Sequence, residues 1–379
     1  MINKNESSFD HKGFSRRTLG LATFLGGVIG LGSRPAMAQP ANLPTPETPN
    51  GTTLVPVADG DGVKRVTLTA SQIEHVLLDT GGKTVVAKGF GFNGETPGPT
   101  LVFNRGDQVA ITVINQLSEP TSVHWHGIIL PNSQDGVPEV GEPTPRIPPG
   151  GSYTYSFRIT QAPGTHMYHS HVDIRSEILG LTGGFIILPA RDGRREYDDR
   201  EDERLDYDRD LIYWLHGWAM PQALAPQMVM GNMIMGNPAL RDRPFTGSPV
   251  DTVNSVTAVP EWQTGGMNFF TMNGKAYPNT EPIVVRRGQK IRVRFFNINL
   301  LTHPIHLHGQ NFQHIAQDGV TLKQPQEMNT IEVAPGRTQD ILITAHNPGV
   351  WPFHCHIAHH QANNFSSSFG GMSTVLRIS

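Results

Sequence analysis

The strongest chemical signature lies in Trp351–His360, because this stretch holds the chain's only cysteine, Cys355, between His354 and His356. In a β-strand successive side chains point to opposite faces, so the two histidines would project to one side and the cysteine to the other. One strand could therefore serve two metal sites. A thiolate with imidazoles favours copper, and a His2Cys set with a weak axial group is a blue-copper electron-transfer centre. Taken alone, the stretch also fits a buried free cysteine beside surface histidines.

Pairs of histidines separated by one residue occur four times. The pairs are His124/His126, His169/His171, His306/His308 and His354/His356. The two-residue period of a strand puts both imidazoles of a pair on one face. If the pairs converge, they supply eight nitrogen ligands. Eight are enough for two metal ions with three ligands each and one with two, leaving open positions for dioxygen and water.

These pairs belong to an internal repeat. The spacing from Gly106 to His124 is identical to the spacing from Gly288 to His306. Four landmarks recur at a nearly constant offset, the last being the pair that contains Cys355. A repeat that spans half of the mature chain predicts two copies of one domain. Short alternating strands with Gly/Pro turns predict an all-β fold of two Greek-key sandwiches.

The chain divides into five predicted segments. Arg16-Arg17, a short apolar run and a small-residue site ending at Ala38 predict a Tat signal peptide, and hence a periplasmic or secreted protein. Nearly every residue of Arg191–Asp210 is charged, with both signs mixed, which predicts a solvated linker. The segments are the signal peptide (1–38), a disordered lead-in (39–53), the first domain (54–190), the charged linker (191–209) and the second domain (210–379).

The composition limits which partners and which chemistry we expect. A formal charge of -3 leaves no broad basic surface, so we expect no nucleic-acid partner. One cysteine excludes an intramolecular disulfide. Seventeen histidines are many for 379 residues, and their clustering points to metal chemistry.

The motifs HWHG, HSH, HPIHLHG and HCHIAHH resemble the copper-binding regions of the laccase-like multicopper oxidases. The resemblance covers nearly all of the mature chain and implies two cupredoxin-like domains with four copper ions: one type 1, one type 2 and two type 3. It implies type 1 ligands His303, Cys355 and His360, type 2 ligands His124 and His306, and type 3 ligands His126, His169, His171, His308, His354 and His356.

The first domain has no counterpart of the type 1 ligands. At the matching positions it carries Thr121, Ser170 and Arg175. Without thiolate or imidazole, no blue site can form there, so this domain should contribute only to the trinuclear cluster. The pattern also speaks against a copper nitrite reductase, a two-domain relative whose type 1 cysteine lies in the first domain.

The resemblance implies catalytic roles as well. Electrons from a donor would pass through Cys355 and the flanking His354 and His356 to the cluster, where dioxygen becomes water. Asp135 matches a family position for proton supply, although Asp135-Gly136 is also a good turn pair.

The axial type 1 ligand has two candidates. Counting from His360 at the family's usual spacing gives Phe365, if there is no insertion. The family's axial residue commonly follows a glycine and opens the final strand, and Gly371-Met372 has that form. We therefore predict Met372, reached across an insertion.

We expect an oxidase of phenols, aromatic amines or metal ions. Five closely spaced methionines, Met220, Met228, Met230, Met233 and Met235, leave open a cuprous oxidase in copper tolerance, because thioether sulfur is a soft ligand for Cu(I). Flexible packing or an apolar substrate wall is the favoured explanation for them. A non-enzymatic copper-sequestering protein is the other alternative. A mature chain of roughly 340 residues has no room for a third domain, and two-domain relatives build each cluster between neighbouring subunits, so we predict a homotrimer.

Overall fold

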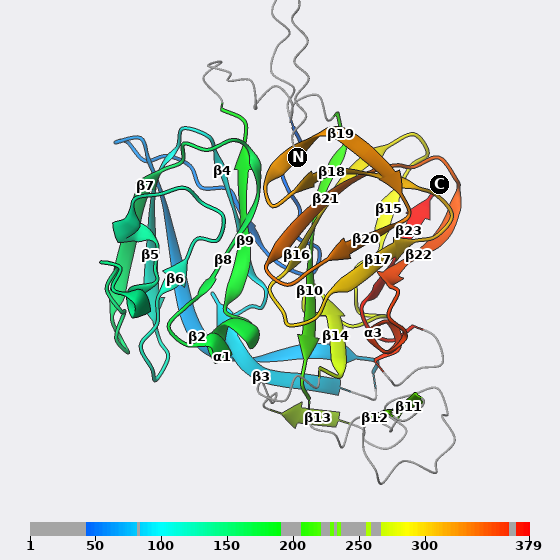
Figure 1. The fold of residues 1–379 in the computed structure, drawn as a ribbon, viewed down its shortest axis with the longest axis horizontal. Coiled ribbons are helices and arrows are strands. Elements are labelled where there is room, and N and C mark those ends of the chain that lie inside the picture. The colour runs from blue at the N-terminus through cyan, green and yellow to red at the C-terminus, as the bar shows by residue number, and fades with distance from the viewer. Residues whose placement is uncertain are drawn as a thin grey trace, which may run out of the picture. The chain divides into compact units, whose positions relative to one another are not determined.

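The computed structural model describes residues 43–81, 84–190, 206–220, 267–363 and 369–379, together with the backbone of three short strands between 228 and 258. The predicted signal peptide and most of the charged linker lie outside the described residues. The described elements are nearly all strands, which confirms the predicted all-β fold (Figure 1). Within the described residues no helix is long and apolar enough to cross a membrane.

The first sandwich packs two five-stranded sheets, in the orders β1-β4-β9-β8-β6 and β13-β3-β2-β5-β7. Their inner faces enclose a core that includes Trp125 and Phe185. The strands are β1 (Thr53–Leu54), β2 (Val63–Asp79), β3 (Thr84–Phe92), β4 (Gly98–Asn104), β5 (Gln108–Asn115), β6 (Val123–His124), β7 (Ser152–Arg158), β8 (Gly164–Ser170), β9 (Thr182–Leu188) and β13 (Ser255–Ala258). The connections contain η1 (Asn132–Gln134), η2 (Pro138–Val140) and α1 (Ile174–Ile178).

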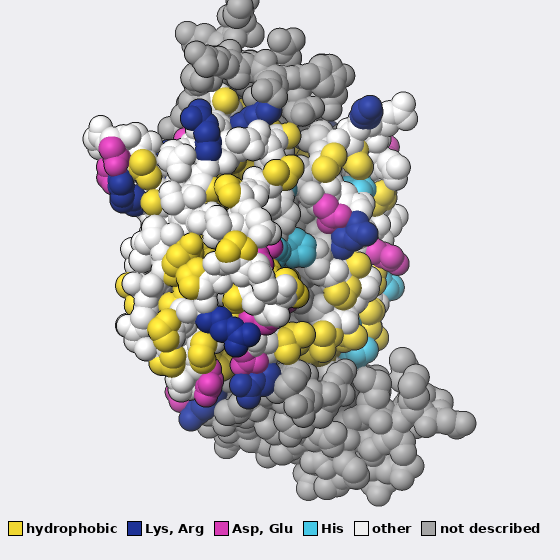
Figure 2. Space-filling model, turned by 60° about the vertical axis from the view of Figure 1, so that its left-hand side comes forward, with side chains coloured by type: hydrophobic (Ala, Val, Ile, Leu, Met, Phe, Trp, Pro, Cys, Tyr) yellow, Lys and Arg dark blue, Asp and Glu magenta, His cyan; other side chains and the backbone are white. Residues whose placement is uncertain are grey.

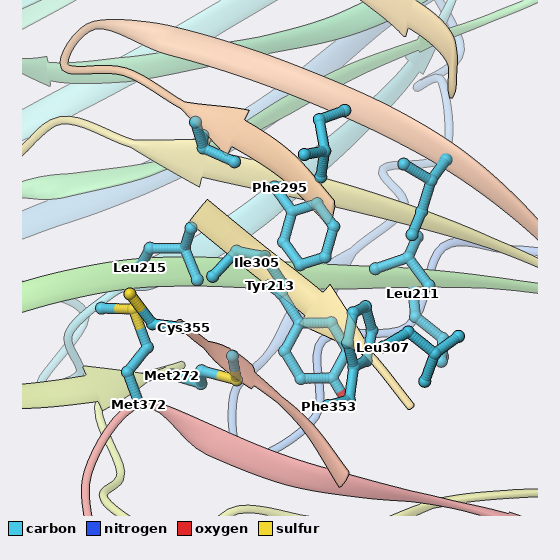
Figure 3. Close-up of a cluster of buried hydrophobic side chains, with 14 of the residues drawn as sticks. Leu211, Tyr213, Leu215, Met272, Phe295, Ile305, Leu307, Phe353, Cys355 and Met372 are labelled. Carbon is cyan, nitrogen blue, oxygen red and sulfur yellow. The ribbon is translucent and has the colours of Figure 1, made fainter. Parts of the chain in front are cut away.

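The second sandwich packs a six-stranded sheet, β14-β10-β16-β21-β18-β19, on a five-stranded sheet, β15-β23-β22-β17-β20. Its core contains Phe295, Phe353 and, at one end, Cys355 with Met372 (Figure 3). The elements are β10 (Arg209–Trp218), β14 (Phe269–Met272), β15 (Ile283–Val285), β16 (Lys290–Asn297), β17 (His303–Leu307), β18 (Phe312–Gln317), β19 (Val320–Met328), β20 (Thr330–Val333), β21 (Arg337–Thr344), β22 (Gly349–Cys355), α3 (Ala358–Ala362) and β23 (Ser373–Ile378). A hairpin of β11 (Met228–Met230) and β12 (Met233–Met235) stands apart from these sheets.

Equivalent strands of the repeat differ in burial. In β5 every second residue is buried, as expected for a strand with one wet face. In β16 every residue after Lys290 is buried. The reason is a second apolar cluster, in which Phe296 and Trp214 of this sheet pack on Val102 and Ile186 of the first sandwich. The outer face of β16 is therefore an interface between the sandwiches.

Two segments depart from the predicted boundaries. Part of the lead-in predicted to be disordered is ordered, because Glu47 pairs with Leu211 in a β-bridge and its carboxylate forms an ion pair with Arg209. Strand β14 pairs only with the later part of β10, so the earlier part has a free edge that supplies these partners. Composition alone cannot reveal such an edge. Strand β13 comes from the second half of the chain but pairs with β3 of the first sandwich.

Candidate metal centres

Two histidines and the cysteine meet at one end of the second core. His303 opens β17, Cys355 ends β22, and His360 lies in α3. The Nδ1 atoms of the two histidines are 3.1 Å apart, and they lie 3.8 and 3.5 Å from Cys355 Sγ. All three side chains are buried. Three converging donors of this kind fit a trigonal His2Cys copper site.

Burial sets the protonation of these ligands. It lowers the pKa of His303 to about 3 and that of His360 to about 2, with neighbouring histidines adding to the effect. Both imidazoles are therefore neutral at pH 7, as ligands must be. Burial raises the pKa of the Cys355 thiol to about 12, so a metal ion must displace its proton.

Met372 lies beside both ligands along the backbone. Its N–H donates to the carbonyl of His360 at 2.9 Å, and its carbonyl accepts from the N–H of Cys355 at 3.0 Å. Its side chain is buried in the same core as Cys355 (Figure 3). These contacts suit the axial role, which stays a prediction; Phe365 lies outside the described residues.

Hydrogen bonds join the two ends of the segment between His360 and Met372. Asn363 ends α3 in the left-handed conformation, with φ 55°, and its Nδ2 donates to the carbonyl of Gly370 at 2.8 Å. The N–H of Gly370 donates to the carbonyl of Gln361. This closure explains how Met372 lies next to His360 despite the intervening residues.

The first sandwich brings its four predicted copper ligands together. His124, His126, His169 and His171 have neighbouring ring centroids 5.4 to 6.2 Å apart. Ligand atoms of the first three all lie within 4.8 Å of one another. The Nε2 of His169 is buried without a hydrogen-bond partner, an arrangement that suits a metal ligand.

The second sandwich gathers the other four predicted ligands, His306, His308, His354 and His356. Their neighbouring ring centroids lie 4.8 to 5.8 Å apart. The Nε2 atoms of His308 and His354 face each other at 3.0 Å. Beside them is an open pocket of about 450 Å³, also lined by Glu327, Asn329 and His346.

The two sets of four remain separate within the chain. Ring contacts join the histidines within each set, and none joins one set to the other among the described residues. Three histidines of the first set are half-buried, and His356 of the second set is exposed. Histidine side chains reach the surface in Figure 2. Within the described residues the eight histidines thus form two candidate half-sites of four rather than one cluster.

Asp135 lies beside a candidate ligand histidine and also forms a turn with Gly136. Its Oδ1 lies 3.5 Å from Nδ1 of His124, and its carbonyl accepts a hydrogen bond from the same nitrogen at 2.9 Å. Gly136 has φ 84°, and a Cβ there would overlap the carbonyl of Val123, so the turn requires glycine. The proton-supplying role of Asp135 stays a prediction.

The matching place in the first sandwich holds hydroxyl groups instead of type 1 ligands. Ser170 Oγ lies 2.7 Å from Ser176 Oγ, and Thr121 is buried. Arg175 pairs with Asp173 at the surface. These side chains offer neither thiolate nor imidazole.

The described histidines without a predicted metal role make other contacts. His75, His314 and His346 each donate to a backbone carbonyl. His166 contacts Gln161, and His216 packs on Trp218. His359 lies against His360 without joining a ligand group, and His11 lies outside the described residues.

Sequence reasoning missed four residues at these centres. Glu139 and Glu177 reach histidines of the first sandwich, and Phe270 and Asn363 pack around His360. None lies in a ligand motif. The left-handed Asn363 after a short helix is a weak signal, and the others become visible only in three dimensions.

Comparisons with known proteins agree with this geometry. Residues 77–192 and 245–371 match two family models, both described as multicopper oxidase. The chain therefore belongs to the multicopper oxidase family, whose members are copper oxidoreductases. Its two sandwiches are cupredoxin domains.

Individual relatives include copper-resistance proteins and oxidases. A copper resistance protein A homolog from Pseudomonas syringae pv. tomato is 29% identical, over 87% of this chain and 54% of its own length. The chain thus spans about half the length of that relative. The multicopper oxidase MmcO of Mycobacterium tuberculosis is 26% identical over 98% of each chain. The crystal structure of a blue copper oxidase from Nitrosomonas europaea matches with a TM-score of 0.62 and 26% identity, over 83% of this chain and 86% of that one.

Proposed function

We propose that this protein is a laccase-like oxidase that couples one-electron oxidation of small donors to the four-electron reduction of dioxygen to water. The observation that carries the proposal is the buried His303, Cys355 and His360 set directly beside a half-site of four histidines. When bound, copper supplies one-electron transfer at the first site and dioxygen reduction at the second, with four ions per chain. A storage protein would not need a His2Cys site next to a cluster of histidines, because it transfers no electrons between them.

The chain's own residues connect the two sites. Cys355 is covalently flanked by His354 and His356, and the strand alternation turns the cysteine into the core and the histidines toward the half-site. The Nδ1 of His354 donates to the carbonyl of Cys355 at 2.9 Å, which fixes that ring and leaves its Nε2 for the cluster. Burial lowers the pKa of His354 to about 4, so the ring stays neutral.

Phenols, aromatic amines and metal ions are the proposed donors. Oxygen uptake by copper-loaded protein with 2,6-dimethoxyphenol tests the proposal, with Cys355→Ser as the control that removes the thiolate. Uptake by the wild type alone supports it. A fully copper-loaded wild type that consumes no oxygen with any phenolic or Cu(I) donor would make it a copper-sequestering protein instead.

We also propose a head-to-tail homotrimer, in which the first half-site of one chain meets the second half-site of its neighbour. Two separate sets of four histidines support this, because neither set alone can hold three ions. Ile129 and Val140, which lie in sequence between the two histidine pairs of the first half-site, are 71% and 80% exposed and would be covered by such a contact. Heterologous contacts of this kind close into rings.

Complementation between two defective chains tests the ring. His124→Ala with His126→Ala disables the first half-site, and His306→Ala with His308→Ala disables the second. Each chain alone should be inactive, whereas an equal mixture refolded together should regain about a quarter of the wild-type activity, since a quarter of random contacts pair two intact halves. Light scattering showing a monomer with full copper content would contradict the trimer.

A cuprous oxidase acting in copper tolerance is the second candidate. It is supported by the methionine-rich segment and by the names of the copper-resistance relatives. Met220 is buried beyond the end of β10, and the other four methionines lie on the β11–β12 hairpin. Replacing all five by leucine should raise the KM for Cu(I) and spare phenols; an unchanged KM for Cu(I) would refute this role.

We also propose that the protein is exported by the Tat pathway. The twin arginine at Arg16-Arg17 and the small-residue site at Ala38 support it. Replacing both arginines by lysine should keep the protein out of the periplasmic fraction and leave its leader uncleaved.

A further inference from the structure

The two half-sites differ in what surrounds their histidines. In the first sandwich, three of the four ligand histidines have a carboxylate near Nδ1. His169 lies 3.3 Å from Glu177, His171 lies 3.2 Å from Glu139, and His124 lies 3.5 Å from Asp135. In each case the distance joins Nδ1 to a side-chain oxygen.

Glu177 and Glu139 come from different elements and are partly screened from solvent. Glu177 lies in α1, its side chain is 19% exposed, and the side chain of His169 is only 6% exposed. Glu139 lies in η2, is 29% exposed and has Arg146 at 3.9 Å from its other oxygen. The Nδ1 of His169 also lies 2.9 Å from the carbonyl of Ser170, so this nitrogen has two acceptors, of which Glu177 is the charged one.

Two histidines of the second half-site have neutral partners at Nδ1. His306 Nδ1 contacts the carbonyl of Asn329 at 2.8 Å and the hydroxyl of Thr330 at 3.0 Å. His354 Nδ1 donates to the carbonyl of Cys355. Glu327 is the acidic residue among those lining the adjoining pocket, and it accepts a hydrogen bond from Asn311.

We propose that Glu177 and Glu139 are positioning residues for the copper cluster, and that the first half-site supplies most of the negative charge that balances it. A carboxylate on the remote nitrogen of a ligand histidine fixes the ring and raises the basicity of the metal-binding nitrogen. Eight neutral imidazoles carry no charge of their own, so copper ions gain electrostatic stabilisation from carboxylates held just outside them. This inference rests on the proposed function, because it concerns the same cluster.

The experiment compares Glu177→Gln and Glu139→Gln with Glu74→Gln, which alters an exposed carboxylate paired with Lys88. Each holoprotein is dialysed against increasing concentrations of a copper chelator. Total copper is measured by elemental mass spectrometry, and the electron paramagnetic resonance spectrum separates type 1 from type 2 copper. The type 1 signal is an internal reference, since its ligands all lie in the second sandwich.

The two glutamine variants should release cluster copper at about 10- to 100-fold lower chelator concentration than wild type, with an unchanged type 1 signal. Glu74→Gln should behave as wild type. Release curves that match wild type would overturn the proposal. Parallel loss of type 1 copper with a lower Tm of the metal-free variant would also overturn it, by making the glutamates structural. A wild type that binds only type 1 copper would instead refute the proposed function.

Discussion

The ring of Phe270 stacks on the imidazole of His360, with ring centroids 3.8 Å apart and 24° between the planes. Phe270 in turn is held by Asn363: the side-chain Oδ1 accepts from the N–H of Phe270 at 2.6 Å, and Nδ2 donates to its carbonyl at 3.2 Å. Asn363 is fully buried. His360, a predicted type 1 ligand, is thus packed against the ring of Phe270. The backbone of Phe270 is in turn held by Asn363, the residue that ends the helix of His360.

Replacing Asn363 with aspartate should disturb this clamp without changing its size. The new carboxylate would face the carbonyls of Phe270 and Gly370, losing two hydrogen bonds at a cost of about 1–3 kcal/mol. We expect the visible band and the potential of the type 1 copper to shift while its stoichiometry is kept. The matched control is Asn347→Asp, whose amide donates to the carbonyl of Gly309 at an exposed position. An unaltered spectrum with lowered stability would mean that the clamp only supports the fold.

Met372→Leu tests the axial ligand. A thioether stabilises the oxidised metal relative to a group that does not coordinate, so the leucine variant should have a higher type 1 potential and an altered visible spectrum. The swap nearly conserves volume and should cost less than about 1.5 kcal/mol of stability. Phe365→Leu should leave the potential as it is. If the potential responds to Phe365→Leu and not to Met372→Leu, the assignment to Met372 is wrong.

The clustering of the candidate ligand histidines could be predicted from the sequence because their information is local. A strand has a period of two, so His306 and His308 must share a face wherever the strand lies. The repeat places Cys355 and Ser170 at equivalent positions, and so predicts that the type 1 ligands lie in the second domain only. Hydrophobic alternation indicated the all-β fold for the same reason.

Partners from distant segments could not be predicted in this way. Glu177 reaches His169 only because a short helix folds back over the end of β8, and Glu47 is ordered only because the start of β10 has a free edge. Nothing in the composition of either segment encodes those neighbours. The division of the ligands into two half-sites is likewise set by how the sandwiches pack.

Asp340→Asn should destabilise the contact between the sandwiches. Asp340 lies 2.7 Å from Arg292 and accepts a hydrogen bond from Thr165 of the first sandwich, while Arg294 pairs with Asp210 at 2.7 Å. The four charged side chains are at most 1% exposed. The variant would remove a buried carboxylate that contacts both Arg292 and Arg294, which costs about 3–5 kcal/mol.

Urea unfolding of the metal-free protein measures that loss. Asp318→Asn, which breaks the exposed pair with Arg337, is the control and should cost about 0–1 kcal/mol. Similar losses in the two variants would show that the buried network contributes no more than a surface ion pair.

Protonation of His75 should weaken the protein as the pH falls. His75 lies on β2, and its Nε2 donates to the carbonyl of Gly274 at 2.8 Å, across the contact between the two halves of the chain. Burial, and next the charge of Lys275, lowers the pKa of His75 from the usual 6.5 to about 4, with the hydrogen bond acting in the opposite direction. The imidazole is therefore neutral in the folded protein at pH 7.

The sign follows from which state binds the proton first. As the pH falls below 6.5, His75 becomes protonated in the unfolded chain, whereas in the folded chain it stays neutral until about pH 4. The stability that is present above pH 6.5 is therefore lost across this window. A difference of this size corresponds to at most about 3 kcal/mol. His75→Gln removes the titrating group. We therefore expect the free energy of unfolding of the metal-free variant, measured in urea from pH 7.5 to pH 4, to fall less steeply than that of wild type. Above about pH 7 the two curves should run parallel. Curves that stay parallel down to pH 4 would show that His75 does not resist protonation in the folded chain.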